Sequence, residues 1–282
     1  MQYRFLRFPG FKSKALTLSY DDGMRSDARL IEILDRYGLK CTFNLNSGLF
    51  AQNEGEGRRL TLEQAVALYS DSPHEVAVHG AKHLSLASID DDGVMREILF
   101  DRGNLERIFG RFVVGMAYAN GSCDDRVAAL VKNCGICYAR TVVSTGKFDL
   151  PENWLLLPAT CHHADARLFA LVDEFLAPEP PSPIWSTRPQ LFYLWGHSYE
   201  FDDHNNWEVI EQFAAKMGGR DDIYYATNGE IYRYVKAYEA LEVSSDDRLI
   251  LNPTAIDVYL DCFGKKVCVR SGQTVNLKKI EI

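Results

Sequence analysis

The feature that most constrains the fold of this chain is a repeated alternation of short apolar runs with stretches of helical periodicity. Repeated strand-then-helix units indicate a parallel sheet with crossover helices, and about seven such units favour a closed or nearly closed barrel. Helices are expected over 26–37, 60–69, 95–109, 126–133, 166–176, 207–217 and 230–241. Strands are expected over 15–20, 41–46, 75–78, 113–118, 136–142, 154–158, 191–195 and 223–226.

The last part of the chain has a different character. Residues 245–282 contain β-branched runs separated by turn residues and show no helical period. We therefore predict a barrel domain over residues 1–244 and a small β-rich C-terminal extension over 245–282. Residues 177–189 are rich in proline and are predicted to form an extended connector within the barrel domain.

Composition narrows the classes of partner. The chain has 39 acidic and 31 basic residues and a net charge of −8, which disfavours nucleic acid as a partner. No apolar run is long enough to cross a bilayer, and residues 1–14 lack the apolar core of a signal peptide. The seven cysteines are an odd number in a chain too large to need disulfides. These features predict a cytoplasmic protein with reduced thiols.

Polar side chains that can bind metal or transfer protons follow several predicted strands. Asp21 and Asp22 follow the first strand, His79 and then His83 follow the third, and His197 follows the strand over 191–195. In a barrel of strands and helices, functional groups lie at the C-terminal ends of the strands. The topology therefore predicts that these five side chains share one site.

The spacing of His79 and His83 is suited to metal binding. Two histidines four residues apart lie on one side of a helical turn, where both can reach one ion. A carboxylate from a neighbouring strand would complete a set of two histidines and one aspartate that leaves positions open for water or substrate. Asp21 and Asp22 point in different directions at a strand end, so one can bind metal while the other acts as a base.

Three motifs resemble those of a known family. Ser19-Tyr20-Asp21-Asp22-Gly23, His79-Gly80-Ala81-Lys82-His83 and Leu194-Trp195-Gly196-His197 are similar to the first, second and fifth motifs of polysaccharide deacetylases. These proteins have the NodB homology domain and form carbohydrate esterase family 4. The order and approximate spacing of the motifs agree, and the resemblance covers about residues 12 to 240.

The resemblance implies an α/β fold, a distorted (β/α)7 barrel, and a hydrolase that removes acetyl groups from N- or O-acetylated carbohydrates. It implies a divalent cation, most often Zn²⁺, with Co²⁺, Ni²⁺ or Mn²⁺ as alternatives, bound by Asp22, His79 and His83. Asp21 would be the general base toward a metal-activated water, and His197 the general acid toward the leaving amine. The substrate would be an acetylated sugar or a small linear amide.

The third motif departs from the family pattern. Met116-Ala117-Tyr118-Ala119-Asn120-Gly121 has Ala117 in the place of an arginine that pairs with the base carboxylate. Either the pKa of Asp21 is raised, or a cation from elsewhere in the chain replaces the arginine. The backbone N–H of Asn120 would still be available to an oxyanion. Trp154 and Asp165 are candidates for the fourth motif.

Other residues are candidates for substrate contact. These are Tyr118 and Trp195, which alternatively belong to the barrel packing, and Asn120, His162 and Glu200. Glu200 alternatively orients His197. His74 and His204 are interpreted as surface histidines.

Three other functions are compatible with these residues. The altered third motif also fits a carbon–nitrogen hydrolase that acts on a non-sugar amide or a cyclic imide. A mononuclear iron oxygenase uses the same set of two histidines and one aspartate. The missing arginine also fits a catalytically degenerate barrel that binds a sugar without turnover.

Overall fold

The computed structural model describes residues 4–178, 188–262 and 264–279. Its centre is a nine-stranded sheet in the order β7-β6-β5-β4-β3-β2-β9-β8, with β10 beside β2. Its strand pairs are parallel, as crossover helices require. The strands are β2 (Lys14–Asp21), β3 (Cys41–Leu45), β4 (Glu75–Val78), β5 (Gly115–Ala117), β6 (Tyr138–Ser144), β7 (Leu157–Ala159), β8 (Cys161–His162), β9 (Gln190–Gly196) and β10 (Ile223–Tyr225).

The two ends of the strand order meet at Thr160. This residue connects β7, which pairs with β6, to β8, which pairs with β9. The backbone N–H of Thr160 donates to the carbonyl of Tyr193 in β9 at 2.9 Å. The sheet therefore curls around on itself as a distorted barrel, which confirms the expected α/β architecture.

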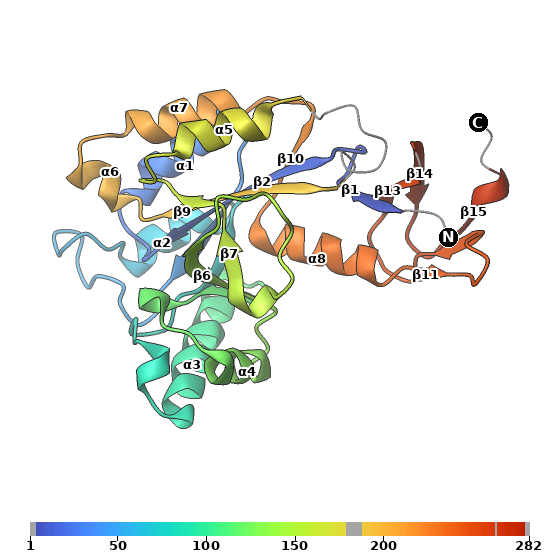
Figure 1. Cartoon of the computed structure of the whole chain (residues 1–282). Coiled ribbons are helices and arrows are strands. Elements are labelled where there is room, and N and C mark those ends of the chain that lie inside the picture. The colour runs from blue at the N-terminus through green and yellow to red at the C-terminus, as the bar shows by residue number, and fades with distance from the viewer. Residues whose placement is uncertain (1–3, 179–187, 263, 280–282) are drawn as a thin grey trace.

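Helices pack against the outside of the sheet (Figure 1). The helices α1, α5 and α7 lie on one side and α3 and α4 on another, while α8 leads away from the barrel. Asp90 caps α3 by accepting from the N–H of Gly93, as its acidic start predicts. The helices are α1 (Asp27–Arg36), α2 (Leu62–Tyr69), α3 (Asp91–Phe109), α4 (Asp125–Asn133), α5 (Leu168–Leu176), α6 (Tyr199–Asp203), α7 (Glu208–Met217) and α8 (Asn228–Glu239).

Alternation along β9 shows that both faces of the sheet are buried. Phe192 and Leu194 pack in the core between the sheet and the outer helices. Leu191, Tyr193 and Trp195 pack in a second core that fills the barrel interior. Strands buried on both faces appear in the sequence as nearly continuous apolar runs, which is why they could be predicted.

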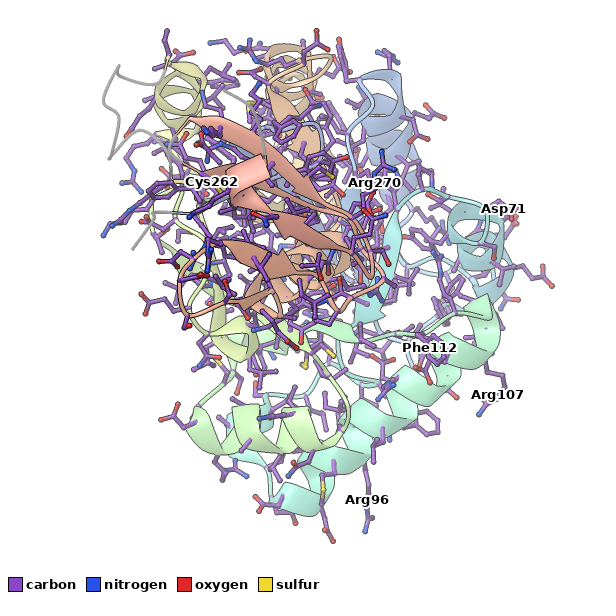
Figure 2. All side chains as sticks on the ribbon, turned by 90° about the vertical axis from the view of Figure 1, so that its right-hand side faces the viewer. Asp71, Arg96, Arg107, Phe112, Cys262 and Arg270 are labelled. Carbon is purple, nitrogen blue, oxygen red and sulfur yellow. The ribbon has the colours of Figure 1, made fainter. Side chains whose placement is uncertain are left out.

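Two small antiparallel sheets follow the barrel, in the order β1-β13-β14 and β11-β12-β15. Figure 2 views the molecule from their side, with Cys262 and Arg270 in front. The N-terminal strand β1 joins the first of these sheets, a pairing that the sequence did not indicate. The boundary after residue 244 stays a prediction. The strands are β1 (Phe5–Arg7), β11 (Glu242–Val243), β12 (Leu249–Leu251), β13 (Val258–Cys262), β14 (Lys265–Val269) and β15 (Thr274–Asn276).

The C-terminal sheets lie away from the ends of the strands that carry the predicted site. β1 leads into the start of β2, and the hydroxyl of Tyr234 in α8 donates to the carbonyl of Arg7 at 2.5 Å. Asn228, at the start of α8, donates through its backbone N–H to Thr42 Oγ1 at 3.0 Å. These contacts place the extension beside the N-terminal ends of the barrel strands.

The expected start of one strand and the expected exposure of one histidine are wrong, and the predicted connector lies partly outside the described residues. Residues Trp154–Leu156 form a 3₁₀ turn, and the strand begins only at Leu157. His74 is buried and not at the surface. Its Nδ1 accepts a hydrogen bond from the N–H of Cys41, which satisfies this nitrogen inside the fold. Most of the predicted connector over 177–189 falls in residues 179–187, which the structure does not describe.

Candidate active site

The parallel register brings the predicted site residues to one end of the barrel. Asp21 is the last residue of β2, and it lies opposite Asn44 of β3. His79 follows β4 directly, and His197 follows β9. Because all of these strands run in the same direction, their C-terminal ends converge.

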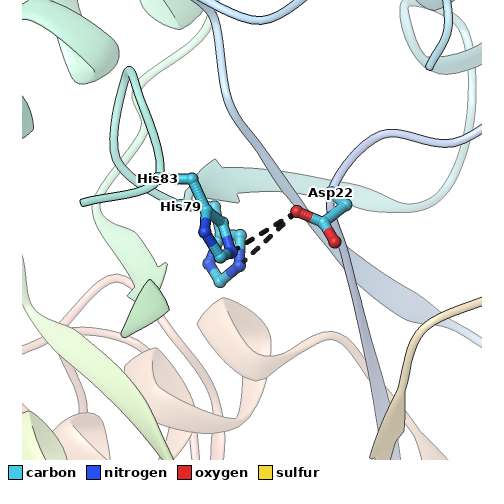
Figure 3. A group of neighbouring side chains, drawn as sticks. All are labelled: Asp22, His79 and His83. Atoms are coloured by element: carbon cyan, nitrogen blue, oxygen red, sulfur yellow. Dashed lines mark ion pairs between the residues drawn. The ribbon is translucent and has the colours of Figure 1, made fainter. Parts of the chain in front are cut away.

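Asp22, His79 and His83 form a compact group of possible metal ligands (Figure 3). Asp22 Oδ1 lies 3.6 Å from His83 Nε2 and 4.0 Å from His79 Nε2. One ligand atom from each residue lies within 4.8 Å of the other two. Both imidazoles point at the same carboxylate oxygen.

The two histidines reach this position on an irregular turn, so the expected helical turn is wrong. Gly80 has φ 80° and His83 has φ 58°, both in the left-handed region. Two buried carboxylates one turn apart on α3 hold the turn. Asp101 accepts from the N–H of His79 at 3.1 Å, and Glu97 accepts from the N–H of Lys82 at 2.5 Å.

The hydrogen bond at the far side of the His79 ring sets its tautomer. His79 Nδ1 lies 2.9 Å from the carbonyl oxygen of Ala117, so Nδ1 carries the proton and donates it. The lone pair of Nε2 then faces Asp22, as a metal-binding histidine requires. Two imidazoles and one carboxylate are the donor set of divalent transition metals, so these residues fit such an ion.

Asp21 is buried, and two side chains partner its carboxylate. Asn44 Nδ2 donates to Oδ1 at 2.8 Å, and the guanidinium of Arg140 pairs with Oδ2. Burial by itself would raise the pKa of Asp21. The charge of Arg140, aided by His79 and His197, outweighs burial and lowers the pKa to about 2.

Arg140 is a residue of the candidate site that the sequence analysis did not identify. It lies in β6 and is completely buried, with its guanidinium carbon 4.3 Å from the centroid of the Trp195 ring. It pairs with Asp21 as the arginine expected at Ala117 would have done. The sequence signal was a single basic residue within the apolar run 138–142, which is rare in a buried strand unless the charge is paired.

His197 lies between two carboxylates. Its Nδ1 is 3.0 Å from Glu200 Oε1, and its Nε2 is 3.9 Å from Asp21 Oδ2. Burial alone would lower the pKa of His197. The hydrogen bond to Glu200 and the charge of Asp21 outweigh it and raise the pKa, which favours the protonated imidazole.

Two further histidines converge on Glu200. Its Oε2 lies 2.8 Å from His163 Nε2 and 3.3 Å from His162 Nε2. His162 Nδ1 accepts a hydrogen bond from the N–H of Ala164 at 3.1 Å, so its Nε2 carries the proton. A protonated nitrogen has no lone pair for a metal. We therefore interpret this cluster as ion-pair contacts around Glu200, although its residue types also suit a cation.

The remaining candidates for substrate contact differ in how exposed their side chains are. Asn120 is exposed and in the left-handed region, and its side chain donates to Ser85 Oγ at 3.0 Å. Tyr118 is buried and donates to the carbonyl of Leu155, and Trp195 packs against Arg140.

The two candidates for the fourth motif, Trp154 and Asp165, have partners other than the five central site residues. Trp154 packs in the barrel interior, and Asp165 pairs with Arg167. The carboxylate that lies beside His197 is instead that of Glu200.

The structure is thus a parallel α/β barrel that carries a buried carboxylate and a set of two histidines and one aspartate at the C-terminal ends of its strands, which is where the sites of such barrels lie. The family model described as polysaccharide deacetylase matches residues 9–139. The matched segment includes Asp21, Asp22, His79 and His83, and it ends one residue before Arg140. Over this segment, which is somewhat less than half of its length, the chain is similar to polysaccharide deacetylases.

Solved structures share the fold. A protein of Mycobacterium smegmatis assigned to the polysaccharide deacetylases is 17% identical with a TM-score of 0.57, and the alignment covers 85% of this chain and 96% of that one. A family 4 carbohydrate esterase from Streptomyces lividans, solved with acetate, is 16% identical with a TM-score of 0.50 and coverages of 76% and 93%.

A third structure matches over a shorter length. The deacetylase PplD of Streptococcus pyogenes, solved with acetate, is 21% identical with a TM-score of 0.45. The alignment covers 50% of this chain and 61% of that protein. No curated protein sequence matches this chain.

Two further features concern the length of the helices and the state of the cysteines. Among the residues that the structure describes, no helix is both long and apolar enough to cross a bilayer. All seven cysteines lie in the described ranges and are free, including Cys134 and Cys137 near the end of α4.

Proposed function

We propose that this protein is a metal-dependent deacetylase that hydrolyses the acetamide of an N-acetylated sugar or the ester of an O-acetylated one. The observation that carries the proposal is the position of Asp21, a buried carboxylate paired with Arg140 and 3.9 Å from His197, next to the group Asp22, His79 and His83. This arrangement supports a role as base for Asp21, as acid for His197 and as cation ligands for Asp22, His79 and His83.

Asp22, His79 and His83 would hold the cation, with Zn²⁺ as the first choice and Co²⁺, Ni²⁺ or Mn²⁺ as alternatives. Such a cation polarises a carbonyl group and lowers the pKa of water. The residues prepare its binding, because Ala117 fixes the His79 tautomer and Arg59 pairs with Asp22 at 3.2 Å. The carboxylate of Asp22 is therefore oriented by the protein itself.

Asp21 would act as the general base. Arg140 and Asn44 partner both of its oxygens, so the carboxylate is ionised at neutral pH and fixed in direction. An ionised carboxylate in this place can accept the proton of an attacking water. Arg140 would also stabilise Asp21 while no substrate is bound, because an unpaired buried charge is strongly unfavourable.

His197 would act as the general acid. Glu200 accepts a hydrogen bond from Nδ1–H, which leaves the Nε2–H of the protonated ring directed toward Asp21. The raised pKa favours the protonated ring. Transfer of the proton to the leaving amine or alcohol completes the hydrolysis.

Two residues at the rim are proposed to contact substrate. The backbone N–H of Asn120 would donate to the oxyanion, and the partly exposed ring of His162 would line the sugar site. The burial of Tyr118 and the stacking of Trp195 under Arg140 favour supporting roles for these two aromatic residues.

The alternatives differ in how the observations bear on them. The missing arginine at position 117 motivated a barrel that binds sugar without turnover, and the charge of Arg140 removes that motivation. A hydrolase acting on a non-sugar amide or cyclic imide would use the same catalytic residues, and only substrate trials separate it from a deacetylase. The cytoplasmic location stays a prediction, with which the free cysteines agree.

The test follows acetate release by purified protein loaded with Zn²⁺ or Co²⁺. The panel contains N-acetylglucosamine oligomers, O-acetylated sugars, linear amides and cyclic imides. We expect release from at least one acetylated sugar, lost on chelation and restored by the metal. Turnover of imides alone, or of no panel member, would contradict the proposal.

Variants identify the residues involved. Asp21→Asn should abolish turnover while the protein still binds the cation, whereas His83→Ala should weaken cation binding itself. His204→Ala is the matched control, because His204 is an exposed histidine just after α6. Loss of activity in the control variant would show that the effect is not specific to the site.

A further inference from the structure

The segment after β3 lies between the two parts of the chain that carry the proposed cation ligands. Asn46 is 1% exposed, and its side-chain nitrogen donates to the carbonyl of His79 at 2.9 Å and to that of Gly80 at 2.7 Å. Its side-chain oxygen accepts from Arg59 Nη1 at 2.9 Å. All hydrogen-bonding groups of the Asn46 amide are thus directed at the site.

Arg59 extends this connection to Asp22. Its Nη1 also donates to the backbone carbonyl of Asp22 at 2.5 Å, and its Nη2 donates to Asp22 Oδ1 at 3.2 Å. The backbone beside Arg59 is itself fixed, since the N–H of Leu60 donates to the carbonyl of Gly23 at 3.0 Å. A continuous series of hydrogen bonds therefore runs from Asp22 through Arg59 and Asn46 to His79 and Gly80.

The backbone at both ends of this series needs support. Asp22 has φ 84°, which is uncommon for a residue with a side chain, and Gly80 has φ 80°. The bonds from Arg59 and Asn46 go to the carbonyls of these same residues. They therefore hold the peptide groups whose orientation directs the Asp22 carboxylate and the His79 ring toward each other.

We propose that Asn46 and Arg59 are positioning residues that preorganise the cation site without supplying a ligand atom to it. The inference rests on the proposed function, because it takes Asp22, His79 and His83 as the ligands. Removal of partners that orient ligands typically lowers metal affinity about 10- to 100-fold. The cation affinity of this chain therefore depends on two residues outside the three motifs.

The charge of Arg59 requires a careful choice of variant. A guanidinium next to Asp22 repels a cation. Removing it would therefore raise cation affinity through the lost charge and lower it through the lost hydrogen bonds. Arg59→Lys keeps the charge and loses the planar fork that binds two oxygens at once. Arg58→Lys is the matched control, because Arg58 is exposed and pairs with Asp203.

The experiment measures Co²⁺ and Zn²⁺ binding to the full chain by calorimetry, with the Co²⁺ absorption spectrum as a second readout of ligand geometry. We expect Asn46→Ala and Arg59→Lys each to weaken binding about 10- to 100-fold and to alter the spectrum. Arg58→Lys should bind like the wild type. Because the two residues act through one series of bonds, the double variant should bind little more weakly than the weaker single variant.

The outcomes separate this inference from the proposed function. Wild-type binding with both single variants within about threefold of it would overturn the inference alone. A wild-type chain that binds neither ion would overturn both. If Asn46→Ala does not fold, the partly exposed position 59 still decides the question, because Arg59→Lys with unchanged affinity and spectrum overturns the inference.

Discussion

Arg140 and Asp21 form a completely buried ion pair between two strands that are 119 residues apart in the chain. Arg140 enters from β6, and Asp21 is the last residue of β2. The pair gives Asp21, the proposed base, the positive charge that the resemblance led us to expect at position 117. That charge thus comes from a different strand.

Replacing Arg140 should impair the proposed base. In Arg140→Met, burial of Asp21 is no longer opposed by a neighbouring guanidinium, so the pKa of Asp21 should rise from about 2. We expect kcat to fall about 10²- to 10⁴-fold at neutral pH, with partial recovery at higher pH as Asp21 ionises. The pH dependence of kcat in the two proteins measures this.

Arg140→Lys provides the comparison, because it retains the charge and loses the two-nitrogen fork. It should keep the acidic limb of the profile close to that of the wild type. An acidic limb that does not move in Arg140→Met would argue against control of Asp21 by this pair.

Glu200 should set the proton affinity of His197. Without the carboxylate, the lowering effect of burial prevails, so Glu200→Gln should lower the pKa of His197 and shift the alkaline limb of kcat to lower pH. We expect about a tenfold loss of kcat with little change in KM. Glu174→Gln, at an exposed position of α5, is the control, and an equal loss there would discount the assignment.

Asp27 should make stability depend on pH. Burial raises its pKa to about 7, against the hydrogen bonds from Ser198, Tyr69 and the N–H of Met24. The native state therefore holds a proton that the unfolded state has released above pH 4, so the contribution of Asp27 to stability falls as pH rises from about 4 to 7. Asp27→Asn should flatten this fall and raise the free energy of unfolding at pH 8 by roughly 1–3 kcal/mol.

Urea unfolding at pH 5 and pH 8 measures the effect of Asp27→Asn. An amide at this position can still accept from Met24 and Tyr69 and donate to Ser198, so the fold should be kept. Asp71→Asn, at an exposed position after α2, should leave the pH dependence unchanged. A steep fall that persists in Asp27→Asn would assign the effect to other groups.

Gly196 should tolerate no side chain. A Cβ at this position would lie 2.0 Å from His163 Nδ1, so the imidazole must move. We expect Gly196→Ala to cost about 1–3 kcal/mol of stability and to lower kcat, because His163 loses its position beside Glu200. Thermal unfolding and kcat check both effects, and a variant with wild-type stability and rate would contradict them.

The sequence by itself determined the parallel sheet and the ligand-bearing strand ends. Strands buried on both faces require continuous apolar runs, and the carboxyl ends of parallel strands must converge, so Asp21, Asp22, His79 and His197 could be placed from local pattern alone. The turn that carries His83 could not, because its left-handed residues depend on carboxylates supplied by α3.

Only the tertiary structure decided which partners hold these side chains. Arg140 reaches Asp21 across the barrel interior, and Arg59 reaches Asp22 from the segment before α2. Such contacts join segments whose separation along the chain has no period and no fixed spacing. Their physical cause is burial: each charge enclosed by the closing sheet needs a counter-charge, and the fold determines which residue is near enough to provide it.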